Sequence, residues 1–251
     1  MSPSFYVVSA VVVFIFSGLL AMAGLGAAFL FVPLFYYLGV PLAEAASTAL
    51  LLNVISLLFA SLNYWRGKLI NWRVGLPVLI MAVILSPLGA RLTGSVNKGL
   101  LLAMFATFLV FAGFMMLFYR AKKREQSLGR PIEVGAGMGI GSVAGFLGGL
   151  LGVGGGNFIL PVVNWLGLDA KMAAGTTALV VVFSSLSGFL GHVTMGGMDP
   201  LFIGITAVMA AAGSIVGSQW MKTRISSSQL KRIIGVLLWA IAAKMIWDLL
   251  K

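Results

Sequence analysis

Two short glycine-rich stretches occupy similar places in two otherwise apolar parts of the sequence. They are Gly24-Leu-Gly-Ala-Ala28 and Gly152-Val-Gly-Gly-Gly156, and each opens an apolar segment that contains a proline. A helix that begins inside a membrane leaves its first N–H groups without partners at the positive end of the helix dipole. Glycine lets an anion approach such a backbone closely. The two stretches therefore predict a binding site for a small anion.

Hydrogen-bonding side chains accompany both stretches. Asn157 follows the second stretch directly, and hydroxyl residues open the next apolar segment of each region. The predicted substrate-binding residues are Gly24, Gly26, Ala27, Ser47, Thr48, Asn53, Gly152, Gly154, Gly155, Gly156, Asn157, Gly175, Thr176 and Thr177. Two alternatives stay open at this point. Glycine also serves close helix packing in membranes, and hydroxyls often bond to their own helix backbone.

Other kinds of chemistry have little to be built from in this chain. It contains no cysteine, one histidine and six scattered acidic residues. Neither a metal site nor an acid–base pair is indicated, so we expect no cofactor and no enzymatic activity. No Lys-Ser or Lys-Thr pair follows the glycines, which argues against a nucleotide phosphate loop.

The composition is that of an integral membrane protein. Of 251 residues, 60% are hydrophobic and 9% are charged, whereas soluble domains carry roughly 25% charged residues. The apolar runs are continuous and about 20 residues long, as transmembrane helices require. The net charge of +11 lies mostly in loops, where it sets topology and meets lipid headgroups. We therefore expect membrane lipids as partners and no nucleic acid.

The sequence repeats itself when Gly24 is aligned with Gly152, and we call this the repeat alignment. Glycines, prolines and hydroxyl residues recur in phase, and this pattern predicts two homologous halves, 1–119 and 132–251, joined by a basic linker, 120–131. The matches include Gly24 to Pro33 with Gly152 to Pro161, Ala45 to Thr48 with Ala173 to Thr176, and Ser86 and Gly89 with Ser214 and Gly217.

Each half divides into five apolar segments. The second segment of each half, 26–37 or 155–166, spans only about 18 Å as a helix, too short to cross a membrane alone. Most basic residues fall on the cytoplasmic side if both chain ends lie outside and the linker lies inside. The fold class predicted is therefore an all-α membrane protein of two inverted repeats, with about eight full transmembrane helices and two half-helices. Whether the short segments cross the membrane or re-enter stays open.

At these residues the chain resembles the TauE/SafE family of sulfite-exporter-like permeases. The motifs that carry the resemblance are Gly148-Gly-Leu-Leu-Gly-Val-Gly-Gly-Gly156 with Pro161, Ala174-Gly-Thr-Thr-Ala178, and the weaker first copies Gly24-Leu-Gly26 with Pro33 and Ala46-Ser-Thr-Ala49. The resemblance covers essentially the whole chain. It implies a carrier of small sulfur-containing anions, such as sulfite or organosulfonates, in the cytoplasmic membrane.

The function predicted is alternating-access export of such an anion. The alternatives are an anion channel, an uptake carrier for another small carboxylate or oxyanion, and a membrane assembly component that transports nothing. The oligomeric state is also open, with a homodimer as one alternative.

Overall fold

The computed structural model describes residues 3–21, 24–118, 129–192, 199–220 and 227–250. Within these residues the chain forms ten α-helices. They are α1 (Pro3–Ala21), α2 (Ala28–Tyr37), α3 (Leu42–Arg66), α4 (Trp72–Leu92), α5 (Lys98–Phe118), α6 (Arg130–Leu151), α7 (Gly156–Trp165), α8 (Ala170–His192), α9 (Pro200–Trp220) and α10 (Ser227–Leu249).

Hydrophobic length explains these elements. Among the described residues, six helices are long and apolar enough to cross a membrane, namely α3, α4, α5, α6, α8 and α9, and shorter apolar helices cover Tyr6–Ala21 and Ala28–Tyr37. Helices α2 and α7 have 10 residues each, as the two short segments predicted. The prediction of an all-helical chain is confirmed for the described residues. The predicted basic linker, 120–131, lies mostly outside them.

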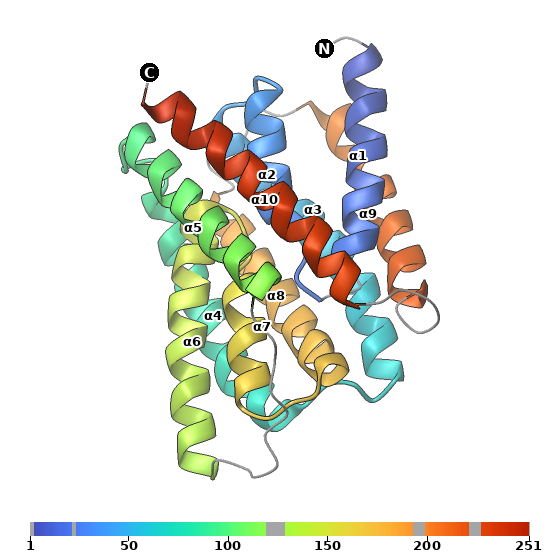
Figure 1. The fold of residues 1–251 in the computed structure, drawn as a ribbon, viewed down its shortest axis with the longest axis vertical. Helices are drawn as coiled ribbons and strands as arrows, with labels where there is room; N and C mark the ends of the chain where they lie inside the picture. The colour runs from blue at the N-terminus through green and yellow to red at the C-terminus, as the bar shows by residue number, and fades with distance from the viewer. Residues whose placement is uncertain (1–2, 22–23, 119–128, 193–198, 221–226, 251) are drawn as a thin grey trace.

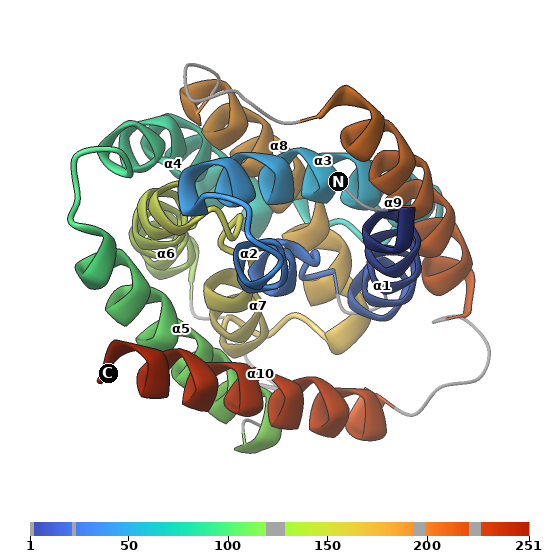
Figure 2. The same ribbon diagram turned by 90° about the horizontal axis from the view of Figure 1, so that it is seen from above.

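The two short helices lie at the centre of the molecule, surrounded by the long ones (Figure 2). In Figure 1, α2 runs from the middle toward the upper end, whereas α7 runs from the middle toward the lower end. Their N-terminal ends therefore meet near mid-height. Helix α1 begins at the upper end and α6 begins at the lower end (Figure 1).

The long helices pack in matching combinations from the two parts of the chain. Helix α4 packs on α6 and α8, and α9 packs on α1 and α3. Helix α3 also packs on α8, and α5 packs on α10. Small residues allow the close contacts, because a Cβ on Gly145 of α6 would lie 2.6 Å from the Ala82 backbone of α4.

Four of the hydrogen bonds between helices form two sets that follow the repeat alignment of the sequence. In each of these bonds a side chain of one helix contacts a backbone carbonyl of another helix. Each set consists of one bond from each half, and the donor and acceptor residues of the two bonds align with each other. One set joins Ser86 Oγ to Ser184 O (2.8 Å) and Ser214 Oγ to Ser56 O. The other set joins Tyr64 OH to Ala21 O (2.7 Å) and His192 Nε2 to Gly149 O (3.0 Å).

Candidate functional site

A left-handed glycine turn joins α6 to α7. Helix α6 ends at Leu151 and is capped by Gly152, and the Val153 N–H bonds to the Gly148 carbonyl at 2.9 Å. Gly152, Gly154 and Gly155 have φ angles of +72°, +73° and +80°, a region that L side chains rarely adopt. The run of glycines therefore lets the chain reverse at once and start α7 at Gly156.

The turn between α1 and α2 has a similar shape. Gly24 and Gly26 have φ angles of +68° and +72°, matching Gly152 and Gly154. The next residue differs, because Ala27 has a φ of −104° where Gly155 has +80°. Ala27 is fully buried and precedes the first residue of α2.

The two turns touch each other beside Asn53 of α3. A Cβ on Gly156 would lie 2.5 Å from the Leu25 carbonyl oxygen, so the second turn packs directly on the first. Asn53 is completely buried and lies against both Gly26 and Gly154. Three predicted glycine positions and Asn53 thus come together at the middle of the molecule.

The Asn53 side chain is hydrogen-bonded in two directions. Its Oδ1 accepts from the Ala28 N–H at 3.4 Å, and its Nδ2 donates to the Ser185 hydroxyl of α8 at 2.9 Å. The oxygen thereby takes up one N–H group at the start of α2, where intrahelical acceptors are missing. Asn53 therefore joins the first turn to α8.

Several predicted glycines are packed against backbone and are not open to a ligand in this conformation. A Cβ on Gly24 would lie 2.0 Å from the Ala174 carbonyl oxygen, and one on Gly152 would lie 2.4 Å from Ala46. A Cβ on Gly155 would lie 2.5 Å from the Ala144 carbonyl oxygen. At these positions glycine allows neighbouring chain segments to approach, which is the packing alternative left open by the sequence.

Asn157 differs from Asn53 because its amide has no partner among the described residues. The side chain is 3% exposed, and neither Oδ1 nor Nδ2 has a hydrogen bond within the described residues. The N–H groups of Phe158 and Ile159 bond to the Gly155 carbonyl, whereas no acceptor in the described part of the chain takes those of Gly156 and Asn157. The start of α7 therefore holds unused donors.

The hydroxyl residues among the predictions have different surroundings. The Thr177 hydroxyl is completely buried and has no partner in the described chain. The Thr176 hydroxyl accepts from the Asn71 N–H at 2.9 Å, and Gly175 lies against the Leu69 carbonyl. These two residues therefore contact the α3–α4 connection. In the first half Thr48 is buried, and Ser47 is only half-buried.

Two serines of α8 contact the site but were not predicted. Ser185 accepts from Asn53, and the Ser184 hydroxyl donates to the Gly154 carbonyl at 3.1 Å. Both are buried near the middle of a long apolar helix. Adjacent serines deep in a transmembrane segment are a signal that could have identified them.

The site can therefore offer hydrogen-bond donors and a helix dipole, and it offers no acid–base pair. Among the described residues, no three His, Asp or Glu side chains gather as metal ligands would. The chemistry of the site suits recognition of a ligand better than bond cleavage.

Known proteins resemble this chain over most of its length. The family described as "Sulfite exporter TauE/SafE" matches residues 9–245. "Probable membrane transporter protein YunE" of Bacillus subtilis is 25% identical over 222 residues, which cover 81% of each chain. "Probable membrane transporter protein y4hK" of Sinorhizobium fredii is 28% identical over 80% of this chain and 81% of its own.

The similarity extends beyond bacteria. "Probable membrane transporter protein MJ0441" of Methanocaldococcus jannaschii is 26% identical over 73% of this chain and 71% of its own. No solved structure matches the chain. The match to the family model confirms the resemblance seen in the glycine motifs, and these three relatives are described as probable membrane transporters. The chain is a multi-pass membrane protein that belongs to the sulfite exporter TauE/SafE family.

Proposed function

We propose that this chain carries a small anion of the sulfite or sulfonate class out of the cell by alternating access. The observation that carries the proposal is the buried amide of Asn157 at the start of α7, which has no partner in the described chain and lies beside backbone N–H groups that also have none there. The name of the family supports the class of anion.

The unused donors define the kind of ligand. A buried amide without partners is unfavourable in a membrane protein, so a ligand or water that satisfies it is favoured. The Asn157 Nδ2 and the N–H groups at the start of α7 are donors, and the helix dipole adds a positive potential there. An oxyanion supplies several acceptor atoms at once. We place the Thr177 hydroxyl as a further donor from α8, because it too is buried and has no partner in the described part of the chain.

The arrangement of the two halves supports alternating access. Hydrogen bonds that are equivalent under the repeat alignment, and the opposite directions of α1 and α6, are what two inverted repeats would produce. In such carriers the site lies at the repeat interface, between short helices that start inside the membrane. We take the close packing of Gly24, Gly152 and Gly155 to represent a closed state, and in this proposal opening toward either side separates these contacts.

Electrostatics favours export over uptake. Among the described acidic residues, Glu44 and Glu133 lie in the first turns of helices, and Asp199 precedes α9. None of these three lies at mid-span, where a coupling cation would be carried. Export of an anion from an inside-negative cell gains about 2.3 kcal/mol per charge per 100 mV, so no coupling ion is required. We propose the topology that agrees with this direction, with both chain ends outside and the linker inside.

Flux into and out of proteoliposomes tests the proposal. We expect saturable movement of radiolabelled sulfite, driven by a potential negative on the side that the sulfite leaves. Sulfonates such as taurine derivatives would compete, and a neutral solute of equal size would not. Absence of saturable flux for every small anion would refute the carrier, and unsaturable single-channel current would indicate a channel in its place.

Variants around α7 locate the site. We expect Asn157→Ala and Thr177→Val to weaken sulfite binding by about ten-fold each, which corresponds to loss of one hydrogen bond to a charged ligand. Asn164→Ala is the matched control, because Asn164 is also a buried amide of α7 and its Oδ1 also has no partner in the described chain. Equal losses in Asn157→Ala and Asn164→Ala would refute a site at the start of α7.

A further inference from the structure

A lysine occupies an unusual backbone position where α3 ends. The Leu69 N–H bonds to the Tyr64 carbonyl and the Lys68 N–H bonds to the Trp65 carbonyl, both at 2.9 Å. This pair of bonds is the Schellman arrangement, in which the residue at the place of Lys68 is left-handed and usually glycine. Lys68 has a φ of +56° and is the one non-glycine residue with positive φ among those described.

The same arrangement elsewhere in the chain uses glycine. Gly39 follows α2 and Gly167 follows α7, with equivalent pairs of bonds and φ angles of +92° and +100°. Position 196, which the repeat alignment places opposite Lys68, is also glycine in the sequence. Since glycine would fit this backbone better, the lysine at position 68 points to a use for its charge.

Lys68 belongs to an exposed basic group at this end of the molecule. Arg66 and Lys68 are both exposed, and neither forms an ion pair with a described residue. Arg73 lies at the start of α4, and Glu133 of α6 neutralises it at 2.9 Å. Two positive charges therefore remain without an ion-pair partner in the described chain, beside the α3–α4 connection.

A large apolar hollow opens next to these charges. It has a volume of about 380 Å³ and is formed by α3, α4 and α8. Its lining is Leu58, Ser61, Leu62, Trp65, Ile70, Trp72, Leu76, Leu79, Leu179, Val182 and Phe183. The Ser61 hydroxyl already donates to the Leu58 carbonyl at 2.9 Å, so the hollow offers water almost no hydrogen bonds. Hydrocarbon suits such a lining better than water does.

Two tryptophans mark the level of the membrane interface. The side chains of Trp65 and Trp72 are 61% and 53% exposed, and neither indole N–H has an acceptor in the described chain. Tryptophan prefers the headgroup level, where its ring lies in hydrocarbon and its N–H reaches a polar group. The mouth of the hollow and the basic residues thus lie where lipid headgroups would be.

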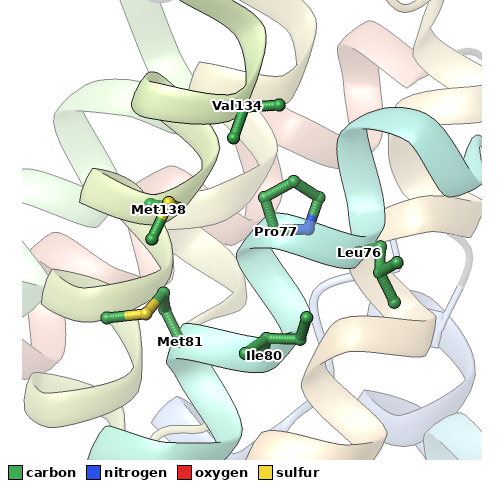
Figure 3. A pocket seen from close by; sticks show the side chains of 6 residues that line it. All are labelled: Leu76, Pro77, Ile80, Met81, Val134 and Met138. Atoms are coloured by element: carbon green, nitrogen blue, oxygen red, sulfur yellow. The ribbon is translucent and has the colours of Figure 1, made fainter. Parts of the chain in front are cut away.

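A second apolar hollow lies on the other side of Leu76. It has a volume of about 190 Å³ and is lined by Leu76, Pro77, Ile80, Met81, Val134 and Met138. Figure 3 shows Val134 and Met138 of α6 beside Pro77 and Met81 of α4. Leu76 therefore lines both apolar hollows, which lie on either side of the N-terminal part of α4.

We propose that this face holds one anionic phospholipid, with its phosphate at Arg66 and Lys68 and its acyl chains in the two hollows astride Leu76. Charge selects the headgroup, because two unpaired cations favour an anionic lipid over a zwitterionic one. The shape of the hollows selects a two-chain lipid over free phosphate. This lipid site is separate from the anion site at Asn157.

Quenching of tryptophan fluorescence by brominated lipids tests the proposal on the full chain in detergent. We expect brominated phosphatidylglycerol to quench at a concentration roughly ten-fold lower than brominated phosphatidylcholine. The Trp65→Phe/Trp72→Phe double variant should lose this selective quenching. Inorganic phosphate at millimolar concentration should not compete. Equal quenching by the two lipids, or competition by phosphate, would overturn the proposal.

Substitutions at Lys68 separate binding from folding. Lys68→Gly places the residue that the backbone favours, so we expect an unchanged or higher melting temperature together with several-fold weaker binding of phosphatidylglycerol. Arg66→Gln/Lys68→Gln should abolish the preference for the anionic lipid. Arg91→Gln/Arg232→Gln removes two exposed charges elsewhere and should preserve it. An equal loss in this control pair, or unchanged selectivity in Lys68→Gly, would refute the assigned phosphate position.

Discussion

The two glycine turns at the centre of the molecule share a backbone path and differ in their side chains. Both use left-handed glycines, and their packing is equivalent under the repeat alignment, since Gly24 contacts Ala174 just as Gly152 contacts Ala46. The polar groups do not correspond in this way. Asn53 matches Val181, and Asn157 matches Phe29.

This difference separates the requirements of folding from those of binding. Both turns need glycine because the backbone reverses there and neighbouring helices approach closely. Each half contributes one asparagine beside the turns, but the first is bonded at both its oxygen and its nitrogen, whereas the second is unused by the described chain. The two turns therefore share a backbone path but carry different polar groups, so the candidate site is not symmetric under the repeat alignment.

Alanine at the turn glycines should have the largest effect on stability. In Gly24→Ala the new methyl group would lie 2.0 Å from the Ala174 carbonyl oxygen, and in Gly152→Ala it would lie 2.4 Å from Ala46. Both positions also have a positive φ, which disfavours any side chain. We expect each to lower the free energy of unfolding by roughly 3 kcal/mol or more. Thermal unfolding in detergent would measure it.

Gly39→Ala is the control for these two variants. Its φ is +92°, but nothing lies within 4 Å of the place that the new methyl group would take, so only the conformational cost of about 1–2 kcal/mol remains. Equal losses in all three variants would show that packing at the two turns contributes nothing.

The two asparagines should respond oppositely to truncation. Asn53→Ala leaves the Ala28 N–H and the Ser185 hydroxyl without a partner and should cost about 1–3 kcal/mol. Asn157→Ala breaks no hydrogen bond of its side chain within the described residues and should change stability by no more than about 0.5 kcal/mol, while it weakens binding of the anion. Unfolding of both variants without ligand measures this difference. If Asn157→Ala lowers the free energy of unfolding more than Asn53→Ala does, the assigned difference between the two asparagines is wrong.

The equivalent serine bonds should contribute equally. Ser86→Ala and Ser214→Ala each remove one hydroxyl that bonds a carbonyl of a neighbouring helix. Hydrogen bonds between membrane helices average about 0.6 kcal/mol, so we expect similar small losses that add in the double variant. Losses that differ by more than about 1 kcal/mol would show that the halves are not energetically equivalent.

The residues that cap α4 and α9 should differ least in their effect on stability, and the difference should depend on pH. Asn71 and Asp199 are counterparts in the repeat alignment, and each side chain accepts from an N–H at the start of its helix. Asp199 also accepts from the Tyr6 hydroxyl, which together with the Leu201 N–H lowers the pKa of the carboxyl. The stabilisation is therefore present at neutral pH and is lost as the pH falls through the acid range.

Asp199→Asn should remove this pH dependence and leave the cap in place. The measurement is the melting temperature between about pH 3 and 7, where the parent chain should lose slightly more stability on acidification than the variant. Parallel curves would mean that the Tyr6–Asp199 bond contributes nothing.

Hydropathy was sufficient to predict the helices because each transmembrane helix needs a long apolar run. The predicted segment 42–65 corresponds to Leu42–Arg66, and the short segment 155–166 corresponds to Gly156–Trp165. Glycine spacing placed the turns correctly for the same kind of reason, since few other residues adopt positive φ. These are local constraints, and they are visible along the sequence.

The contacts of the site could not be predicted in this way. Nothing local to Asn53 indicates that its partner is Ser185, in the other half of the chain. Nor does the glycine pattern show that Gly24 and Gly155 meet backbone in this conformation. These facts depend on how α3, α7 and α8 cross, which is decided by packing over the whole molecule.

Asn53 has a consequence for how this protein is made. Its oxygen serves the beginning of α2 and its nitrogen serves α8, so the first half synthesised alone would bury an amide donor with no acceptor. Helices α1 and α4 likewise find their main neighbours, α9 and α6, in the other half. We therefore expect the native packing of the first half to form only after the later helices have entered the bilayer.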